Sequence, residues 1–144
     1  MKVVIQRCNK AFVTVNKKKI GIIDFGLTIF VGFTEGDNEQ TVDYMVNKII
    51  NLRIFDDENG IMNKSIIDVC GSVLSVPQFT LYGDASKGNR PSYFKALKGL
   101  LAEKLYDQFN NKLQQYIPVE KGLFKSEMLV NLENNGPVTI IIEK

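Results

Sequence analysis

Two short polar segments hold the residues of this sequence whose types and spacing could support chemistry. Gln78 and Thr80 are two positions apart, and Asn134-Asn135-Gly136-Pro137-Val138-Thr139 separates two apolar runs. On a strand, alternate residues share one face, so Gln78 and Thr80 would have Cα atoms roughly 6.5–7 Å apart on the same side. Polar groups on an apolar face must pair or line a cavity. Two interpretations of Gln78 and Thr80 therefore stay open: the two side chains form a hydrogen-bonded pair in the core, or they form the polar wall of a functional site.

Histidine is absent from all 144 residues. Its absence excludes Ser-His-Asp and Cys-His hydrolases, HExxH proteases and the usual zinc sites. Thr80 consequently has no histidine base to make its hydroxyl a good nucleophile. Proton transfers in an enzyme with this sequence would use carboxylates, lysines, hydroxyls, the backbone or the substrate. No metal and no cofactor is expected.

The second segment has a simple structural interpretation. Asn135-Gly136 is the signal of a two-residue type I′ hairpin turn, and Pro137 could end the strand pairing beside it. Only about 5–6% of X–Pro bonds are cis in folded proteins, so the residues alone do not predict an unusual peptide geometry.

Length and composition are those of a single soluble domain spanning residues 1–144, with 44% hydrophobic and 24% charged residues. No apolar run approaches the ~20 residues of a membrane span and no signal peptide is visible, so a cytoplasmic protein is expected. The net charge of +2 is too small to predict a nucleic-acid binder, and solvated lysines are the simpler interpretation. Cys8 and Cys70 are predicted to be buried free thiols.

Strands are predicted from runs rich in β-branched and aromatic residues. Both faces of the 71–82 run are largely apolar, which predicts a central strand buried on both sides. Pro77 cannot donate to a ladder, so pairing should be interrupted there. The expected strand ranges are 2–15, 20–23, 27–33, 71–82, 128–132 and 138–143.

Two helices are predicted from apolar residues three or four positions apart. The first should begin after Asp37, which forms a capping box with Gln40, and its apolar stripe is Val42, Met45, Val46, Ile49 and Ile50. The second should follow Pro91 and end before Pro118. Its stripe, predicted to be core, is Leu97, Leu101, Leu105, Phe109, Leu113 and Tyr116. The fold class is α+β: an antiparallel, barrel-like or two-sheet β domain with two helices.

Several segments resemble one known family in order along the chain. Gln78-Phe79-Thr80-Leu81 and the 134–139 segment are similar to the two signature motifs of the D-aminoacyl-tRNA deacylases. The other matching landmarks are Gln6-Arg7, Arg53-Ile54-Phe55-Asp56, Gly60, Met62-Asn63, Lys87-Gly88-Asn89-Arg90-Pro91-Ser92, Gly122-Leu123-Phe124 and Met128.

The resemblance implies a homodimer in which each active site joins two chains. Gly136-Pro137 would carry a cis peptide and reach into the pocket of the partner subunit, where its backbone carbonyls bind the α-amino group and exclude L-side chains. Arg7 would hold this turn in place. Such selection by exclusion admits D-amino acids and glycine.

The implied reaction is hydrolysis of the ester that joins an amino acid to the terminal ribose of tRNA, including glycyl-tRNA(Ala). The 2′-hydroxyl of the RNA would assist, and backbone N–H groups near Phe79 would stabilise the oxyanion. Gln78 and Thr80 would shape the catalytic site, and a threonine nucleophile is the less favoured alternative. The implied substrate-binding residues are Gly136, Pro137, Arg7, Pro77, Phe124 and Met128. The expected partner is the acceptor end of aminoacyl-tRNA, without DNA or membrane.

The sequence departs from the family pattern at two places. Pro77 stands where the family usually has serine, which removes a hydroxyl and an N–H beside the reaction centre. Lys125-Ser126 replaces the usual Gly-Ala after Phe124, which would narrow or recharge the pocket rim. Because of Pro77, a catalytically weak tRNA-binding dimer and a deacylase with relaxed chirality stay open as alternatives.

Overall fold

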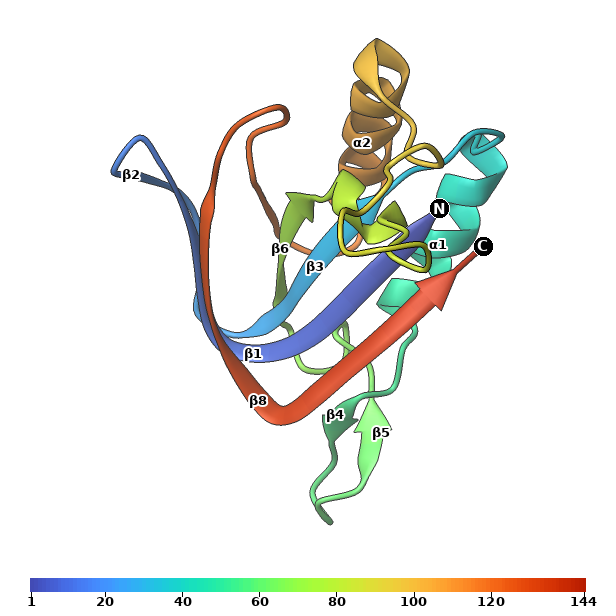
Figure 1. The fold of residues 1–144 in the computed structure, drawn as a ribbon. Coiled ribbons are helices and arrows are strands. Elements are labelled where there is room, and N and C mark those ends of the chain that lie inside the picture. Colours follow the sequence, from blue (N-terminus) through green and yellow to red (C-terminus); the bar gives the residue numbers. More distant parts are fainter.

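The computed structural model describes residues 1–144, which form a strongly curved sheet with two helices on one side and a small hairpin beneath (Figure 1). The elements are β1 (Lys2–Val15), β2 (Lys18–Ile23), β3 (Gly26–Gly32), α1 (Glu39–Ile50), β4 (Phe55–Asp56), β5 (Met62–Lys64), β6 (Ser72–Pro77), the 3₁₀ helix η1 (Phe79–Tyr82), α2 (Gly99–Leu113), β7 (Val119–Lys121) and β8 (Leu129–Glu143).

The large sheet has the order β2-β1-β3-β6-β7, and β8 pairs with β1. Strand β1 is long enough to pair with β3 through its first half and with β2 through its second, while β8 follows it on the other side. The ends of the chain therefore lie side by side (Figure 1), with the Met1 amino group 2.8 Å from the Lys144 carbonyl oxygen.

The expectation of an antiparallel sheet is correct only for the part around β1. Strands β3 and β6 are parallel, as are β6 and β7, so the sheet is mixed. Parallel neighbours need a crossover of a dozen or more residues. Here α1 and the β4–β5 hairpin supply the first crossover and α2 supplies the second. The α+β class, the two helices and the barrel-like curvature are confirmed.

Hydrophobic packing follows the two sides of the curved sheet. The larger cluster of buried side chains joins α1 and α2 to β1 and β3, and includes Met45, Ile49, Phe109 and Leu113. The smaller cluster lies inside the curl of the sheet, around Cys8, Val13, Leu74 and Val76. Strand β6 contributes to both, which confirms that it is buried on both faces.

Helix α1 buries the predicted stripe, but its cap is one residue later than expected. Asn38 is the N-cap, and its side-chain oxygen accepts hydrogen bonds from the backbone N–H groups of Gln40 and Thr41. The Asp37 carboxylate is already used, since it accepts from the Thr34 N–H at 2.8 Å and from the Met1 amino group at 2.6 Å. The capping box predicted for Asp37 and Gln40 is therefore wrong.

Helix α2 begins at Gly99, well after the predicted start behind Pro91. The preceding backbone makes strand-like bonds instead, because Ser92 bridges to Asp84 and the Leu97 N–H donates to the Phe33 carbonyl at 2.8 Å. Its stripe is only partly core: Leu105, Phe109 and Leu113 are buried, whereas Leu101 and Tyr116 are more than half exposed.

The two cysteines differ in a way that the sequence did not reveal. Cys8 is fully buried, and burial raises the pKa of its thiol. Cys70 is exposed and adopts a left-handed φ of 51°, so the prediction that it is buried is wrong. It occupies the turn before β6, where the next residue, Gly71, donates to the Ile66 carbonyl.

Candidate active site

The first polar segment lies where β6 ends and η1 begins. The Gln78 N–H still donates to the Val31 carbonyl of β3 at 2.8 Å, after which the chain turns into the 3₁₀ helix. The strand predicted to reach Tyr82 therefore stops at Pro77, where the expected interruption occurs. The side chains of Gln78 and Thr80 do meet, because the Gln78 amide donates to the Thr80 hydroxyl. A tight turn brings them together, and not the face of a strand.

A cavity of about 760 Å³ opens beside this junction. Pro77, Gln78 and Phe79 line one side of it, and Phe124 and Met128 line another. These five predicted site residues therefore surround one space, although nearly fifty positions separate the two groups. Thr80 does not line the cavity; it is exposed at the edge and contacts Gln78.

The wall opposite η1 is formed by the segment between β7 and β8. The Gly122 N–H donates to the Ser75 carbonyl at 2.7 Å, and a Cβ on Gly122 would lie 2.8 Å from the Met128 sulfur and 3.2 Å from Pro77 Cδ. Only glycine permits this close approach. The family landmark at Gly122 thus has a packing reason in this structure.

Tyr106 of α2 supports the same wall from behind. Its hydroxyl donates to the Ser75 carbonyl at 2.9 Å, and its ring lies 5.9 Å from that of Phe124. Burial raises the pKa of Tyr106 to about 12, so the phenol stays protonated and keeps this hydrogen bond at neutral pH.

The cavity has a third side that the sequence did not point to. Phe79 meets the ring of Tyr93 edge-on at 5.3 Å, and the beginning of α2 completes the rim. Gly99, between the first two residues of the predicted stripe, could have indicated where α2 starts, but nothing local shows that this end of the helix faces the cavity. The residues missed include Tyr93, Leu97, Lys98, Gly99 and Ala102.

The second polar segment is a wide bulge within one strand. Asn134 is in register with Cys8 and Thr139 with Gln6, so both sides of the segment pair with β1. The four residues from Asn135 to Val138 therefore lie opposite the single residue Arg7. The hairpin turn expected here is wrong, because a hairpin would pair the two sides with each other.

Arg7 makes the contacts that hold this bulge. Its guanidinium donates to the Asn135 carbonyl at 3.2 Å and to the Asn135 side chain at 3.4 Å. It also donates to the Ile54 carbonyl at 2.8 Å and pairs with Asp56 at 3.3 Å. The side chain is buried, and it connects the bulge to Ile54 and Asp56 of the family landmark 53–56.

Gly136 and Pro137 do not line the cavity of their own chain. Gly136 has φ +114°, and a Cβ there would lie 2.7 Å from Arg7 Nη2. The Gly136–Pro137 peptide is trans, so the cis peptide expected from the resemblance is wrong for this structure. The trans isomer is the intrinsically favoured one by ~0.5–1 kcal/mol, and Gly136 provides the unusual backbone angle by itself.

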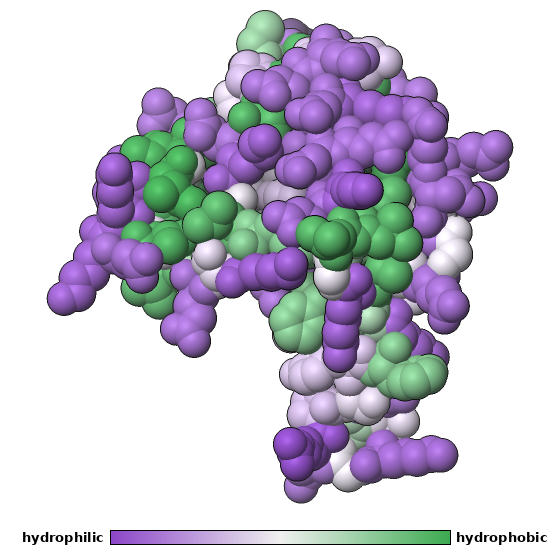
Figure 2. Space-filling view, turned by 90° about the horizontal axis from the view of Figure 1, so that it is seen from above, coloured by the Kyte–Doolittle hydropathy of each residue, from purple (hydrophilic) through white to green (hydrophobic).

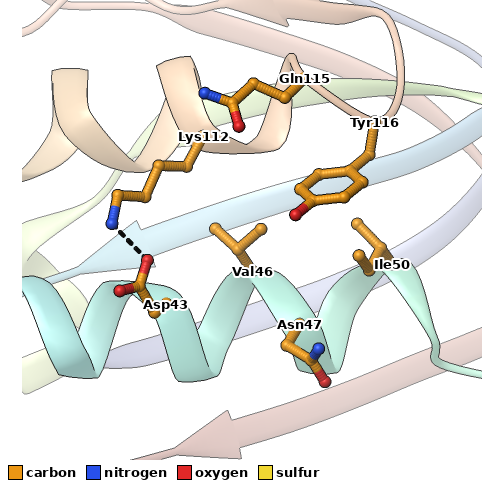
Figure 3. Close-up of a pocket in the computed structure, with 7 residues that line it drawn as sticks. All are labelled: Asp43, Val46, Asn47, Ile50, Lys112, Gln115 and Tyr116. Atoms are coloured by element: carbon orange, nitrogen blue, oxygen red, sulfur yellow. Dashed lines mark hydrogen bonds and ion pairs between the residues drawn. The ribbon is translucent and has the colours of Figure 1, made fainter.

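A second, smaller cavity of about 320 Å³ lies between α1 and α2, away from both segments (Figure 3). Lys112 of α2 forms ion pairs with Asp43 and Glu39 of α1. These two carboxylates raise the pKa of Lys112. None of the predicted site residues lines this cavity. It is a cleft between two helices that are joined by these ion pairs.

Neither helix is long and apolar enough to cross a membrane. No group of three or more His, Cys, Asp or Glu side chains gathers in a way that could hold a metal ion.

The model of the D-Tyr-tRNA(Tyr) deacylase family matches residues 4–143. The chain belongs to this family. Its membership makes it a D-aminoacyl-tRNA deacylase, an ester hydrolase of tRNA proofreading. A D-aminoacyl-tRNA deacylase of Bacillus cytotoxicus is 54% identical over 144 residues, which are 99% of each chain.

Solved structures agree with the deacylase fold. A structure described as a c-Myc DNA unwinding element binding protein has a TM-score of 0.94 at 38% identity, covering 100% of this chain and 99% of that one. Another, described as a probable eukaryotic D-amino acid tRNA deacylase, has a TM-score of 0.84 at 17% identity and covers 98% of this chain and 97% of its own. At that identity the second likeness concerns the fold alone.

Proposed function

We propose that this protein hydrolyses the ester between a D-amino acid, or glycine on tRNA(Ala), and the terminal ribose of tRNA, and that it spares L-aminoacyl esters. The match to the deacylase family over residues 4–143 carries this proposal. The cavity supports it, because widely separated residues of the matched region, between Val31 and Val130, line one space large enough for an aminoacyl group.

The chemistry must proceed without histidine. We assign the assisting hydroxyl to the substrate's own 2′-OH, since the Thr80 hydroxyl accepts a hydrogen bond from the Gln78 amide and has no base beside it. As the first residues of a 3₁₀ helix, Phe79 and Thr80 donate no backbone hydrogen bond within it. Their N–H groups are our candidates for stabilising the oxyanion, and Gln78 and Thr80 shape the site around it.

Substrate selection would need a second copy of the chain. None of the 15 residues of β8 is buried, and β8 pairs only with β1, which leaves its other edge open. An open strand edge is a template for pairing with another chain. Figure 2 shows hydrophobic areas interrupting one largely hydrophilic face of the molecule. These features support a homodimer in which the Gly136-Pro137 bulge of one copy, held by Arg7, excludes L-side chains from the other copy's cavity.

The direct test is the rate of ester loss from purified D-Tyr-tRNA and L-Tyr-tRNA. The protein should accelerate loss of the D-ester far beyond the rate in buffer and leave the L-ester at the buffer rate. Glycyl-tRNA(Ala) should behave like the D-ester. No acceleration for any of these substrates would contradict the proposal.

Pro77 favours a second candidate. It lines the cavity and offers neither a hydroxyl nor a backbone N–H. The absence of these two groups would be consistent with a dimer that binds aminoacyl-tRNA but hydrolyses its ester weakly. It would also be consistent with a dimer that accepts L-alanyl esters. The ester assay together with a tRNA-binding measurement separates them: tight binding with slow loss of the D-ester indicates the first, and rapid loss of the ester of L-Ala-tRNA indicates the second.

A further inference from the structure

Lys125 lies at the rim of the cavity in a backbone conformation that lysine rarely adopts. Its φ is +58°, in the left-handed region that favours glycine. The segment is anchored on both sides, because the Gly122 N–H donates to the Ser75 carbonyl before it and strand β8 begins at Leu129 after it. Backbone strain that anchored neighbours maintain indicates that the side chain of Lys125 has a function.

Two lysines and one carboxylate contribute the charges that line the cavity. Lys98 and Lys125 both line the cavity, together with one carboxylate, Glu127. Lys125 Nζ lies 3.4 Å from Glu103 Oε2 of α2. The two side chains are 58% and 39% exposed, so this ion pair is weak and easily exchanged.

We propose that Lys125 is a substrate-binding residue that leaves Glu103 to bind a backbone phosphate of the RNA next to the ester in the cavity. This inference rests on the proposed function, because the ester must occupy the cavity for the adjoining phosphate to lie at its rim. Lysine is suited to this role as a flexible point charge that binds phosphate without a fixed geometry. Lys98, which also lines the cavity, adds to the positive potential that attracts the same group.

In this proposal Glu103 competes with the phosphate for Lys125. Substitutions of the two residues should therefore change the KM for D-aminoacyl-tRNA in opposite directions. Lys125→Ala should raise the KM for D-aminoacyl-tRNA by roughly 5–10-fold, with a much smaller change in kcat, and should lower the salt dependence of binding by ~0.7 of a log unit per log unit. Glu103→Gln should lower that KM by about 2-fold, since it frees Lys125 and removes a negative charge from the rim. Lys125→Arg should restore most of the affinity.

A substrate without a phosphate tests whether the effect of Lys125 comes from its contact with that group. For D-aminoacyl-adenosine, which carries the ester but no phosphodiester, Lys125→Ala should change KM several-fold less than it does for the tRNA. Lys125→Gly provides a variant free of backbone strain and should behave like Lys125→Ala. Lys48→Ala is the matched control for loss of one positive charge, because Lys48 is an exposed residue of α1 and no residue of α1 lines the cavity.

Three results would overturn the inference. Equal effects of Lys125→Ala on both substrates would mean that the residue only shapes the rim. A rise in KM from Glu103→Gln would mean that the ion pair is a structural latch. A control effect from Lys48→Ala as large as that of Lys125→Ala would mean that net charge alone matters. Failure of the unsubstituted protein to hydrolyse D-aminoacyl-adenosine and D-aminoacyl-tRNA would instead contradict the proposed function.

Discussion

Among single residues, Thr80 shows how surroundings decide what a reactive side chain can do. Its hydroxyl is exposed and hydrogen-bonded to the Gln78 amide, and the sequence holds no histidine that could act as its base. An amide is not a base, so it can orient the hydroxyl but cannot take its proton. The proposed reaction therefore depends on Thr80 for the shape of the site and not for a covalent intermediate.

Thr80→Ala should slow hydrolysis of D-Tyr-tRNA by about 10-fold or less, the rate equivalent of roughly one neutral hydrogen bond. Single-turnover rates would measure the effect, and circular dichroism would show that the fold is kept. Complete loss of the reaction in a folded variant, together with an acyl-enzyme trapped from the unsubstituted protein, would establish the nucleophile model instead.

Among the elements, β8 is the one whose irregularity matters most. Its bulge opposite Arg7 depends on Gly136, which combines a φ of +114° with a close approach to the guanidinium. The same guanidinium also bonds to the Ile54 carbonyl, at the end of the segment that leads into β4. The bulge, β1 and the β4–β5 hairpin are therefore coupled through one side chain.

Gly136→Ala should lower the free energy of unfolding by about 1–3 kcal/mol, because the backbone is strained and Arg7 must move. The preference for D-Tyr-tRNA over L-Tyr-tRNA should fall as well. Gly88→Ala is the matched control: Gly88 also has a positive φ, +95°, but a Cβ there meets nothing within 4 Å. Urea unfolding and the two ester assays check both effects. Unchanged selectivity in Gly136→Ala would contradict the role of the bulge.

For the whole molecule, the open edge of β8 is the feature that supports the proposed homodimer. A long strand that pairs on one side only, with no buried residue, leaves backbone donors and acceptors that a second copy could satisfy. The Gly136-Pro137 bulge lies on this strand and away from its own cavity. The proposed composite site would use both features.

Light scattering of the purified protein should give twice the 16.3 kDa mass of one chain. On dilution, the activity per chain should fall together with the dimer fraction, because a lone chain lacks the second copy's bulge. A single-chain mass with full activity and full preference for the D-ester would contradict the composite site.

The local properties of this protein could be predicted from its sequence. Runs of β-branched and aromatic residues located β1 and β3. Hydrophobic periodicity located the buried stripe of α1, since apolar side chains repeat with the period of the helix that buries them. Pro77 marked the end of strand pairing because its missing N–H acts wherever it occurs. The absence of histidine restricted the chemistry, and ordered motifs along the chain identified the deacylase family.

Contacts between distant segments were decided only by the tertiary structure. The parallel pairing of β3 with β6 follows from a crossover through α1, which no local pattern distinguishes from an antiparallel return. Asn38 caps α1 because Asp37 is occupied by the distant Met1 amino group. The cavity joins 77–79 to 124–128 and to the start of α2, and the bulge forms because Arg7 bonds to Asn135. Periodicity records which face of an element is buried, but its neighbours are chosen by packing of the whole chain.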